Sequence, residues 1–188
     1  MIADRVRNRE ELVRLVKQGR PVHYFFFWGH KPLPNGEIGK SCLSQWWPSA
    51  FSVDGVNYPT AEHFMMVQKA VLFRDEDSRA RILEASGPKA AKQLGRQVNN
   101  FNEETWREHR FEFVVAGNYA KFSQNVELGR FLMGTGHDVL VEASPMDRIW
   151  GIGLAASDQR ATNPVLWRGS NLLGFALMEV RARLRGSD

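Results

Sequence analysis

The spacing of apolar and polar residues predicts a chain built mostly of helices, with a few short strands. Helical patterns occupy residues 8–19, 60–74, 78–86, 87–95, 102–122, 125–136 and 171–184. Strand patterns occupy residues 21–28, 51–58 and 138–144. Residues expected to cap helices at their N-termini are Asn8, Thr60, Asn102 and Asn171. The Asp54-Gly55 pair suits the two-residue turn of a hairpin. We therefore expect a mainly α, single-domain helical fold over residues 1–188, with a few short β-strands.

The helix predicted for residues 60–74 is unusual because apolar residues surround it on every side. With successive residues about 100° apart, Glu62 and Lys69 fall on one stripe of this helix. A helix that is apolar all round is normally buried, so both charges are predicted to lie inside the protein or at a cavity wall. They stand about two turns and roughly 10 Å apart, which suits two groups flanking a bound molecule. The alternative, with equal weight on this stretch alone, is that they line a solvent-exposed gap.

A second candidate stretch, residues 141–153, follows the strand predicted for 138–144. Asp147 would lie on a loop, with Trp150 close behind it, and glycines at 151 and 153 allow tight turns or a close approach to a ligand. A carboxylate and an aromatic ring at a strand end make a plausible pocket rim. On this segment alone, a simple Asp turn followed by a core tryptophan is the favoured interpretation.

Three other polar groups carry weaker signals. His63 lies off the Glu62 stripe and is more typical of a packed or capping histidine than of a metal ligand. Asn118, Lys121 and Asn125 lie on one side of a helix, where a polar stripe usually marks a solvated face. Asn171 is expected to do no more than cap the last helix on local pattern alone.

Composition limits the class of protein. The chain has 188 residues, 43% of them hydrophobic and 24% charged, which fits one globular domain and argues against disorder. No apolar run approaches the length of a membrane span, and the first residues have no apolar signal-peptide core. Cys42 is the single cysteine, so neither an internal disulfide nor a thiol-based metal cluster is expected. A cytoplasmic protein is the simplest expectation.

The net charge bears on whether the partner is anionic, and the aromatic content on whether it is flat. The net charge of +4 mildly favours phosphates or nucleic acid, although the positive residues are scattered and form no block. Six tryptophans and twelve phenylalanines exceed what stacking on a ligand requires, so most should lie in the core. Trp46, Trp47 and Trp150 are the candidates for stacking on a flat base.

Several motifs in order give the chain a resemblance to a known family. The segments are SQWWPSAF, YPTAEHFMMVQKA, LGRQVNNF, KFSQN, LVEASPMDRIWGIG and NLLGFALMEVR. In this order they resemble the NADAR family, also called YbiA-like or riboflavin-biosynthesis-intermediate N-glycosidases. The resemblance implies a mainly helical fold and cleavage of a C–N bond between a ribose and a nitrogenous base. One branch of the family hydrolyses early phosphorylated riboflavin intermediates, and another removes ADP-ribose from guanine bases.

The resemblance also suggests which residues act. Glu62 and Lys69 match the family's S/T-E-H-x-x-x-x-x-K helix, so the resemblance implies that their stripe is functional. The segment D-x-x-W-G-x-G is matched by Asp147, Trp150, Gly151 and Gly153. Ile152 stands where some members carry Asp, which bears on the substrate subgroup more than on the chemistry.

These residue types suit N-glycoside cleavage, in which positive charge develops on the ribose ring. Glu62 or Asp147 can stabilise that charge while the other acts as an acid or positions water. In a second route the Lys69 amine attacks the anomeric carbon and forms a Schiff base, which requires burial to lower its pKa. The start of the helix at residues 60–63 can attract a phosphate. No metal or other cofactor is expected. The predicted substrate-binding residues are Trp150, Gly151, Gly153, Trp46, Trp47, His63 and Asn171.

Three functions follow, from two classes. The first is hydrolysis of a small ribosylamino-pyrimidine phosphate, and the second is removal of ADP-ribose from guanine in nucleic acid. The third is a non-catalytic module that binds ADP-ribose or a related nucleotide. A pure binder has little use for a buried lysine near a carboxylate, and the dispersed positive charge favours the small molecule over nucleic acid.

Overall fold

The computed structural model describes residues 6–186, and within them helices dominate. The mainly α class with a few short strands is confirmed. The chain divides into two compact units, one made of residues Met1–Leu43 and Arg130–Asp188 and the other of residues Ser44–Gly129. We call them the terminal unit and the central unit. The prediction of a single domain stays a prediction.

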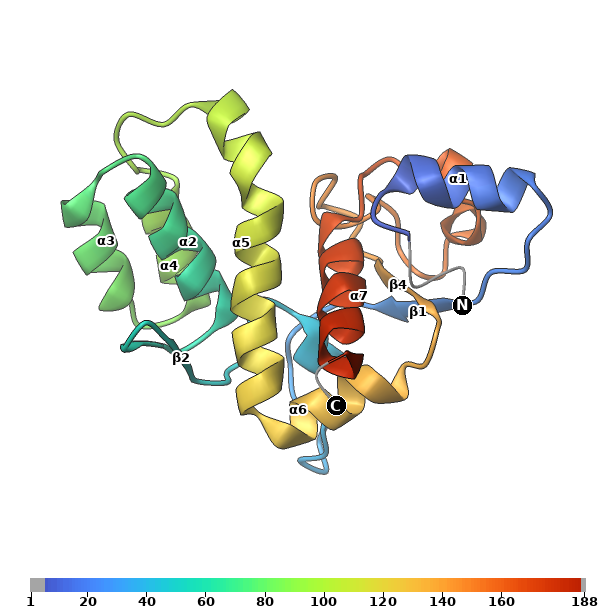
Figure 1. Cartoon of the computed structure of the whole chain (residues 1–188), viewed down its shortest axis with the longest axis horizontal. Helices are drawn as coiled ribbons and strands as arrows, with labels where there is room; N and C mark the ends of the chain where they lie inside the picture. The colour runs from blue at the N-terminus through green and yellow to red at the C-terminus, as the bar shows by residue number, and fades with distance from the viewer. Residues whose placement is uncertain (1–5, 187–188) are drawn as a thin grey trace. The chain divides into compact units, whose positions relative to one another are not determined.

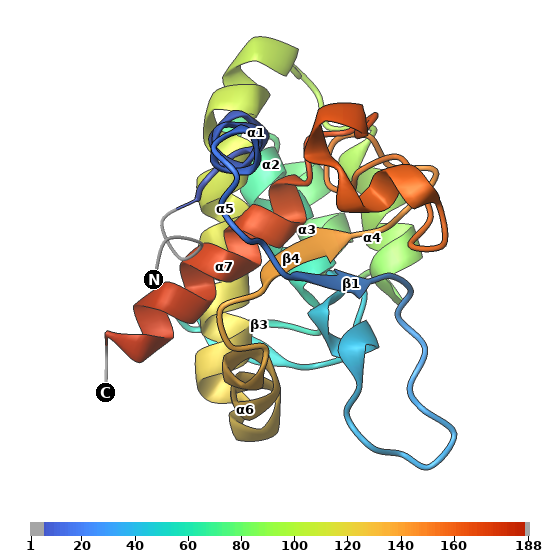
Figure 2. The same ribbon diagram turned by 90° about the vertical axis from the view of Figure 1, so that its right-hand side faces the viewer.

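The terminal unit is organised around two parallel strands, β1 (Tyr24–Phe27) and β4 (Val139–Glu142). Tyr24 pairs with Val139 and Phe27 with Glu142, and Figure 2 shows the two strands side by side. Helix α7 (Leu172–Arg185) packs against β4. The first three residues of β4 are fully buried, because α7 covers them. Among its described residues, the unit also holds short 3₁₀ turns at Lys40–Leu43, Gln159–Thr162 and Pro164–Leu166.

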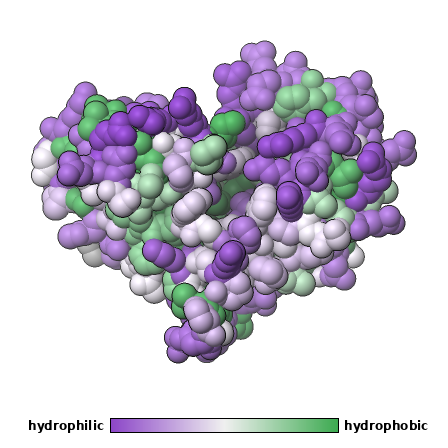
Figure 3. Space-filling model, turned by 180° about the vertical axis from the view of Figure 1, so that it is seen from behind, coloured by the Kyte–Doolittle hydropathy of each residue, from purple (hydrophilic) through white to green (hydrophobic). Residues whose placement is uncertain are grey.

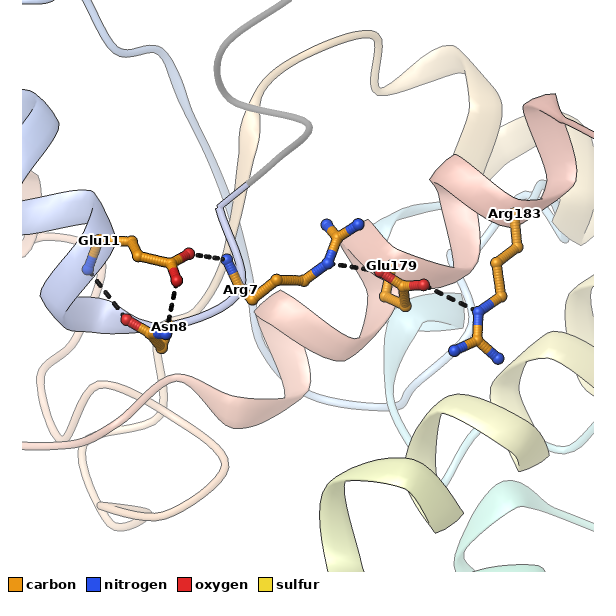
Figure 4. Close-up of polar contacts among 5 residues, drawn as sticks. All are labelled: Arg7, Asn8, Glu11, Glu179 and Arg183. Carbon is orange, nitrogen blue, oxygen red and sulfur yellow. Dashed lines mark hydrogen bonds and ion pairs between the residues drawn. The ribbon is translucent and has the colours of Figure 1, made fainter.

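Helix α1 (Arg9–Lys17) begins where its sequence predicts. The Asn8 side chain accepts a hydrogen bond from the Glu11 backbone N–H at 2.9 Å, and Asn8 Nδ2 donates to Glu11 Oε1 at 3.0 Å. The Arg7 backbone N–H donates to the other Glu11 oxygen, while the Arg7 side chain forms an ion pair of 2.6 Å with Glu179 of α7 (Figure 4). Arg183 contacts Glu179 from the opposite side at 2.8 Å. The cap therefore also joins the start of α1 to α7.

The central unit begins with a hairpin and continues as helices. Strands β2 (Phe51–Val53) and β3 (Val56–Tyr58) are antiparallel, and both turn residues have positive φ, 51° for Asp54 and 77° for Gly55. This is the turn predicted from the sequence, and its two left-handed residues match a primed hairpin turn. The helices of the unit are α2 (Ala61–Leu72), α3 (Glu76–Leu83), α4 (Pro88–Gly95) and α5 (Glu103–Gln124). Helix α6 (Val126–Gly134) follows and crosses the division between units.

Helix α2 is the centre of the central unit. It packs against α3, α4 and α5, which surround it in Figure 1. Helix α3 begins two residues earlier than the pattern indicates, because the Asp75 side chain accepts a hydrogen bond from the Ser78 N–H and caps it there. A second Asp75 oxygen accepts the Asn99 N–H at 2.8 Å, and these hydrogen bonds hold the pKa of Asp75 below its ordinary value.

Some large apolar side chains of the described residues are exposed at the surface. The visible face in Figure 3 is largely hydrophilic or near neutral in hydropathy, with hydrophobic residues in small patches. Large hydrophobic side chains that remain exposed include Trp28, Val71, Phe101, Val126 and Met146. Within residues 6–186, no helix combines the length and the apolar character that a membrane span requires.

Candidate functional site

The two charges of α2 are buried. Glu62 is 2% exposed and Lys69 is 9% exposed. The same helix also buries Phe64, Met65 and Val67, and burying such side chains stabilises the fold by about 1.5–3 kcal/mol each. The prediction of burial is confirmed, and the alternative of a solvent-exposed gap is wrong. Within α2 only Val71 is exposed, at 44%, while Gln68 and Leu72 are half-buried.

Lys69 is enclosed by aromatic rings and a carbonyl. Its Nζ donates a hydrogen bond of 2.8 Å to the Gly95 carbonyl and lies 3.9 Å from the centre of the Phe101 ring and 5.8 Å from that of Trp106. Burial lowers the pKa of the Lys69 amine below its ordinary value, and Arg96 lowers it further, while Glu103 opposes the shift. The neutral, nucleophilic amine is therefore more abundant than in an exposed lysine.

Glu62 occupies the first turn of α2. Its backbone N–H donates to the Gln45 carbonyl at 3.0 Å, which ties residues 44–45 to the start of the helix. The positive end of the helix dipole favours a carboxylate at this position.

His63 is a packed, capping histidine, as its position in the sequence indicates. It has no exposed surface, and its ring nitrogens contact Thr60 Oγ1 at 2.8 Å and the Ala85 carbonyl at 3.2 Å. Because a carbonyl only accepts, the proton lies on Nε2 and the Thr60 hydroxyl donates to Nδ1. Burial lowers the pKa of His63. Its predicted role in substrate binding stays a prediction.

The lowered pKa of His63 gives a pH dependence of stability. The unfolded chain takes up a proton near pH 6.5 before the folded chain does, so the free energy of unfolding should decrease as the pH falls below about 6.5. Urea unfolding at about pH 7.5 and about pH 5.5 measures this loss. His63→Gln should reduce the loss, whereas replacement of the exposed His109 by Gln should leave it unchanged. Equal losses in both variants would assign the pH dependence to other groups.

A buried polar cluster near Glu62 escaped prediction. Asn118 and Lys121 have no exposed surface, so the expectation of a solvated polar stripe on this face is wrong. Asn118 Nδ2 donates to Gln45 Oε1 at 2.6 Å and to the Val114 carbonyl at 2.8 Å. Lys121 Nζ donates to the Ser44 carbonyl at 2.9 Å. The overlooked signal was the apolar residues that flank this stripe along α5, which bury it.

Trp46 and Trp47 come directly after Gln45 in the sequence. Both are half-buried, and the Lys92 ammonium lies 5.8 Å from the centre of the Trp46 ring. Half-burial leaves part of a tryptophan surface available for contact. Their predicted stacking on a base is consistent with this exposure and stays a prediction.

The second candidate stretch lies in the terminal unit, after β4. Asp147 Oδ1 accepts backbone hydrogen bonds from Ile149 at 2.8 Å and Trp150 at 2.7 Å, so the segment does form an Asp turn. Trp150 is half-buried, however, and the interpretation as a fully buried core tryptophan is wrong. Asp147 is itself only partly exposed.

The glycines of this stretch are required by the chain's own backbone. A Cβ on Gly151 would lie 2.8 Å from the Glu142 carbonyl oxygen, and Gly153 has a φ of 67°. Gly151 therefore leaves no room for a Cβ, and Gly153 has a left-handed backbone that strains most larger residues. A ligand is not needed to explain either glycine, and their predicted role in binding stays a prediction.

Asn171 is not the side-chain cap that the sequence predicts. Its φ of 54° is left-handed, and its side chain makes no capping hydrogen bond to α7. The amide instead turns to β4, where Oδ1 accepts the Glu142 N–H and Nδ2 donates to the Leu140 carbonyl, both at 2.9 Å. Asn171 thus fastens the start of α7 to the buried strand. Its predicted contact with substrate stays a prediction.

The two buried hydrogen bonds of Asn171 should make Asn171→Ala strongly destabilising. Removing the amide leaves two β4 backbone groups without this partner, and alanine is strained at a left-handed φ, so a loss of about 3 kcal/mol is expected. Asn100→Ala is the matched control, because Asn100 has a φ of 56° but is exposed. Urea unfolding at neutral pH measures both variants. Equal losses would mean that backbone strain, rather than the hydrogen bonds to β4, accounts for the effect.

The predicted residues thus fall into two groups. The central unit holds Glu62, Lys69, His63, Trp46 and Trp47. The terminal unit holds Asp147, Trp150, Gly151, Gly153 and Asn171. Within the described part of the chain, no three His, Cys, Asp or Glu side chains come together as metal ligands.

Comparison with known proteins assigns a family to this fold and these motifs. Residues 26–185 match the model of the NADAR domain, and the chain belongs to this family. It is 42% identical to N-glycosidase R617 of Acanthamoeba polyphaga mimivirus over 163 residues, which cover 84% of this chain and 94% of the relative. It is 33% identical to N-glycosidase YbiA of Escherichia coli strain K12 over 138 residues, covering 73% of this chain and 76% of YbiA.

Two further matches concern the fold and a longer relative. The NMR structure of Escherichia coli YbiA superimposes with a TM-score of 0.70 at 27% identity, covering 88% of this chain and 86% of that one. A riboflavin biosynthesis protein of Vibrio vulnificus is 30% identical over 143 residues, which cover 76% of this chain but only 35% of the relative. The resemblance inferred from the motifs is therefore confirmed.

Proposed function

We propose that this protein hydrolyses the C–N bond between ribose 5-phosphate and the pyrimidine amine of early riboflavin-biosynthesis intermediates. The enzyme class, a hydrolase acting on N-glycosyl bonds, follows from membership of a family whose relatives are named N-glycosidases. The riboflavin biosynthesis protein among the relatives supports the small-molecule substrate. A cytoplasmic location is part of the same proposal.

The observation that carries the proposal is the burial of Glu62 and Lys69 on one stripe of α2. A buried carboxylate is well suited to stabilise the positive charge that develops on ribose as the C–N bond breaks. A buried amine of lowered pKa is suited to attack the anomeric carbon. Neither feature is needed for binding alone, and burying two charged groups is costly to stability.

The favoured route uses Lys69 as a nucleophile. The neutral amine forms a bond to the anomeric carbon while the bond to the base breaks, and the base leaves with a proton from a carboxylic acid. The sugar ring opens to an imine on Nζ, and water then hydrolyses the imine to release ribose 5-phosphate and the free amine. Glu62 stabilises the charge on the ring. Asp147 is the second proposed catalytic carboxylate, and Asp147→Asn tests it in the same assay.

The test is mass spectrometry of reactions with each candidate substrate. The purified protein is incubated with a ribosylamino-pyrimidine phosphate and, separately, with ADP-ribosylated guanine in an oligonucleotide. Release of ribose 5-phosphate from the first supports the proposal, and Glu62→Gln serves as the control for a contaminating activity. If ADP-ribose is released from the oligonucleotide and nothing is released from the pyrimidine compound, the substrate is ADP-ribosylated guanine. Tight binding of either compound without release would make the protein a binding module.

A further inference from the structure

Gln45 and Asn118 form a buried amide pair with two unused polar atoms. Gln45 is 6% exposed and Asn118 has no exposed surface. Both N–H groups of Asn118 are used, one on Gln45 Oε1 at 2.6 Å and one on the Val114 carbonyl at 2.8 Å. Those bonds fix the orientation of both amides, because a carbonyl oxygen only accepts. Within the described residues, Gln45 Nε2 and Asn118 Oδ1 have no hydrogen-bond partner.

Leaving these two buried polar atoms without partners lowers the stability of the fold. A buried polar atom without a partner costs about 1–3 kcal/mol, and buried side-chain polar atoms in folded proteins are mostly paired. Nε2 shares a carbon with the accepting oxygen of Gln45, and Oδ1 shares a carbon with the donating nitrogen of Asn118. The unused donor and the unused acceptor are therefore close neighbours. Together they offer the N–H donors of Nε2 and the acceptor Oδ1 to one ligand.

The pair is joined through the Gln45 backbone to Glu62, the residue that carries the proposed catalytic carboxylate. The Gln45 carbonyl accepts the Glu62 N–H at 3.0 Å, so Gln45 is attached to the first turn of α2. Asn118 lies one turn before Lys121 on α5, and Lys121 holds the Ser44 carbonyl at 2.9 Å. The backbone of residues 44–45 is thus hydrogen-bonded to both α2 and α5, and the bond to Asn118 holds the Gln45 side chain.

We propose that Gln45 and Asn118 recognise the base of the substrate through its lactam edge, the adjacent ring N–H and C=O. Gln45 Nε2 donates to the ring carbonyl and Asn118 Oδ1 accepts from the ring N–H. The inference rests on the proposed function and specifies which substrates that site selects. Pyrimidinones carry such an edge, and a base methylated at that nitrogen does not offer the N–H.

Direct binding of a free base tests this recognition without turnover. The probe is 5,6-diaminouracil, compared with its derivative methylated at the ring nitrogen N3, in isothermal titrations. Wild-type protein should bind the unmethylated base at least about tenfold more tightly than the methylated one. This ratio corresponds to the free energy of one lost buried hydrogen bond. Gln45→Met removes the donor at nearly constant volume and should weaken binding of the unmethylated base about tenfold. Gln97→Met, an exposed glutamine of the same unit, is the matched control.

The outcomes separate recognition from packing and from the proposed function. Asn118→Leu should abolish the preference for the unmethylated base, and circular dichroism confirms that each variant is folded. If folded variants lose stability but keep wild-type preference, or if wild-type protein shows no preference, the amide pair is structural and the proposal is overturned. Failure of the proposed function has a different signature, since the wild-type protein would then release no ribose 5-phosphate while still preferring the unmethylated base.

Discussion

Glu62→Gln is expected to lower kcat on the ribosylamino-pyrimidine phosphate by about 10²- to 10⁴-fold, the range typical of removing a side chain that acts in the transition state. The substitution keeps the shape of the side chain and removes its charge, so the stabilisation of the ribose cation is lost while ground-state binding remains. The dissociation constant of the substrate should change by less than about threefold, because a neutral amide fills the same space.

Steady-state kinetics together with titration of the intact substrate measure these two quantities separately. Glu84→Gln is the control, because Glu84 is exposed on the central unit and follows α3. Turnover of Glu62→Gln within a few fold of the wild-type rate would remove Glu62 from the mechanism. A large rise in the dissociation constant with unchanged kcat would make Glu62 a binding residue instead.

Lys69 should become covalently attached to ring-opened ribose when borohydride is added during turnover. Borohydride reduces the imine on Nζ to a stable amine, which peptide mass mapping locates. The kcat should also rise with pH through the lowered pKa of the Lys69 amine, because deprotonation supplies the nucleophile. Lys69→Arg should lose about 10³-fold or more in kcat, since a guanidinium stays protonated.

The exposed Lys89 provides an internal control in the same digest, since its peptide should stay unmodified. An unmodified Lys69 peptide combined with an active arginine variant would exclude the imine. Lys69 would then hold charge for a direct hydrolysis in which the carboxylates activate water. The hydrogen bond to Gly95 and the ring of Phe101 would be the reason that a cation is tolerated there.

Local signals in the sequence predicted most elements of the fold. Asn8, Thr60 and Asn102 cap helices as expected, because the signal for an N-cap is contained in a few adjacent residues. The N-cap prediction was wrong for Asn171, whose side chain does not cap α7. Its amide is used by β4, a strand about thirty residues earlier, and no local pattern contains that contact.

The candidate site was predictable only in part. The all-round apolar pattern of α2 sufficed to predict the burial of Glu62 and Lys69. The amide pair could not be found in this way, because Gln45 and Asn118 are brought together by the packing of residues 44–45 between two helices. The spacing of polar residues along a helix is the same whether water or another segment of the chain covers them.

The pairing of β1 with β4 has a consequence for the order in which the chain acquires its structure. The central unit is one continuous stretch of chain, whereas the terminal unit needs Tyr24 to meet Val139 from the far side of that stretch. Contacts this distant in sequence form late, because closing a long loop costs entropy before any contact repays it. During synthesis on the ribosome, the backbone N–H and C=O groups of Tyr24–Phe27 that pair with β4 therefore lack this partner until β4 has been made.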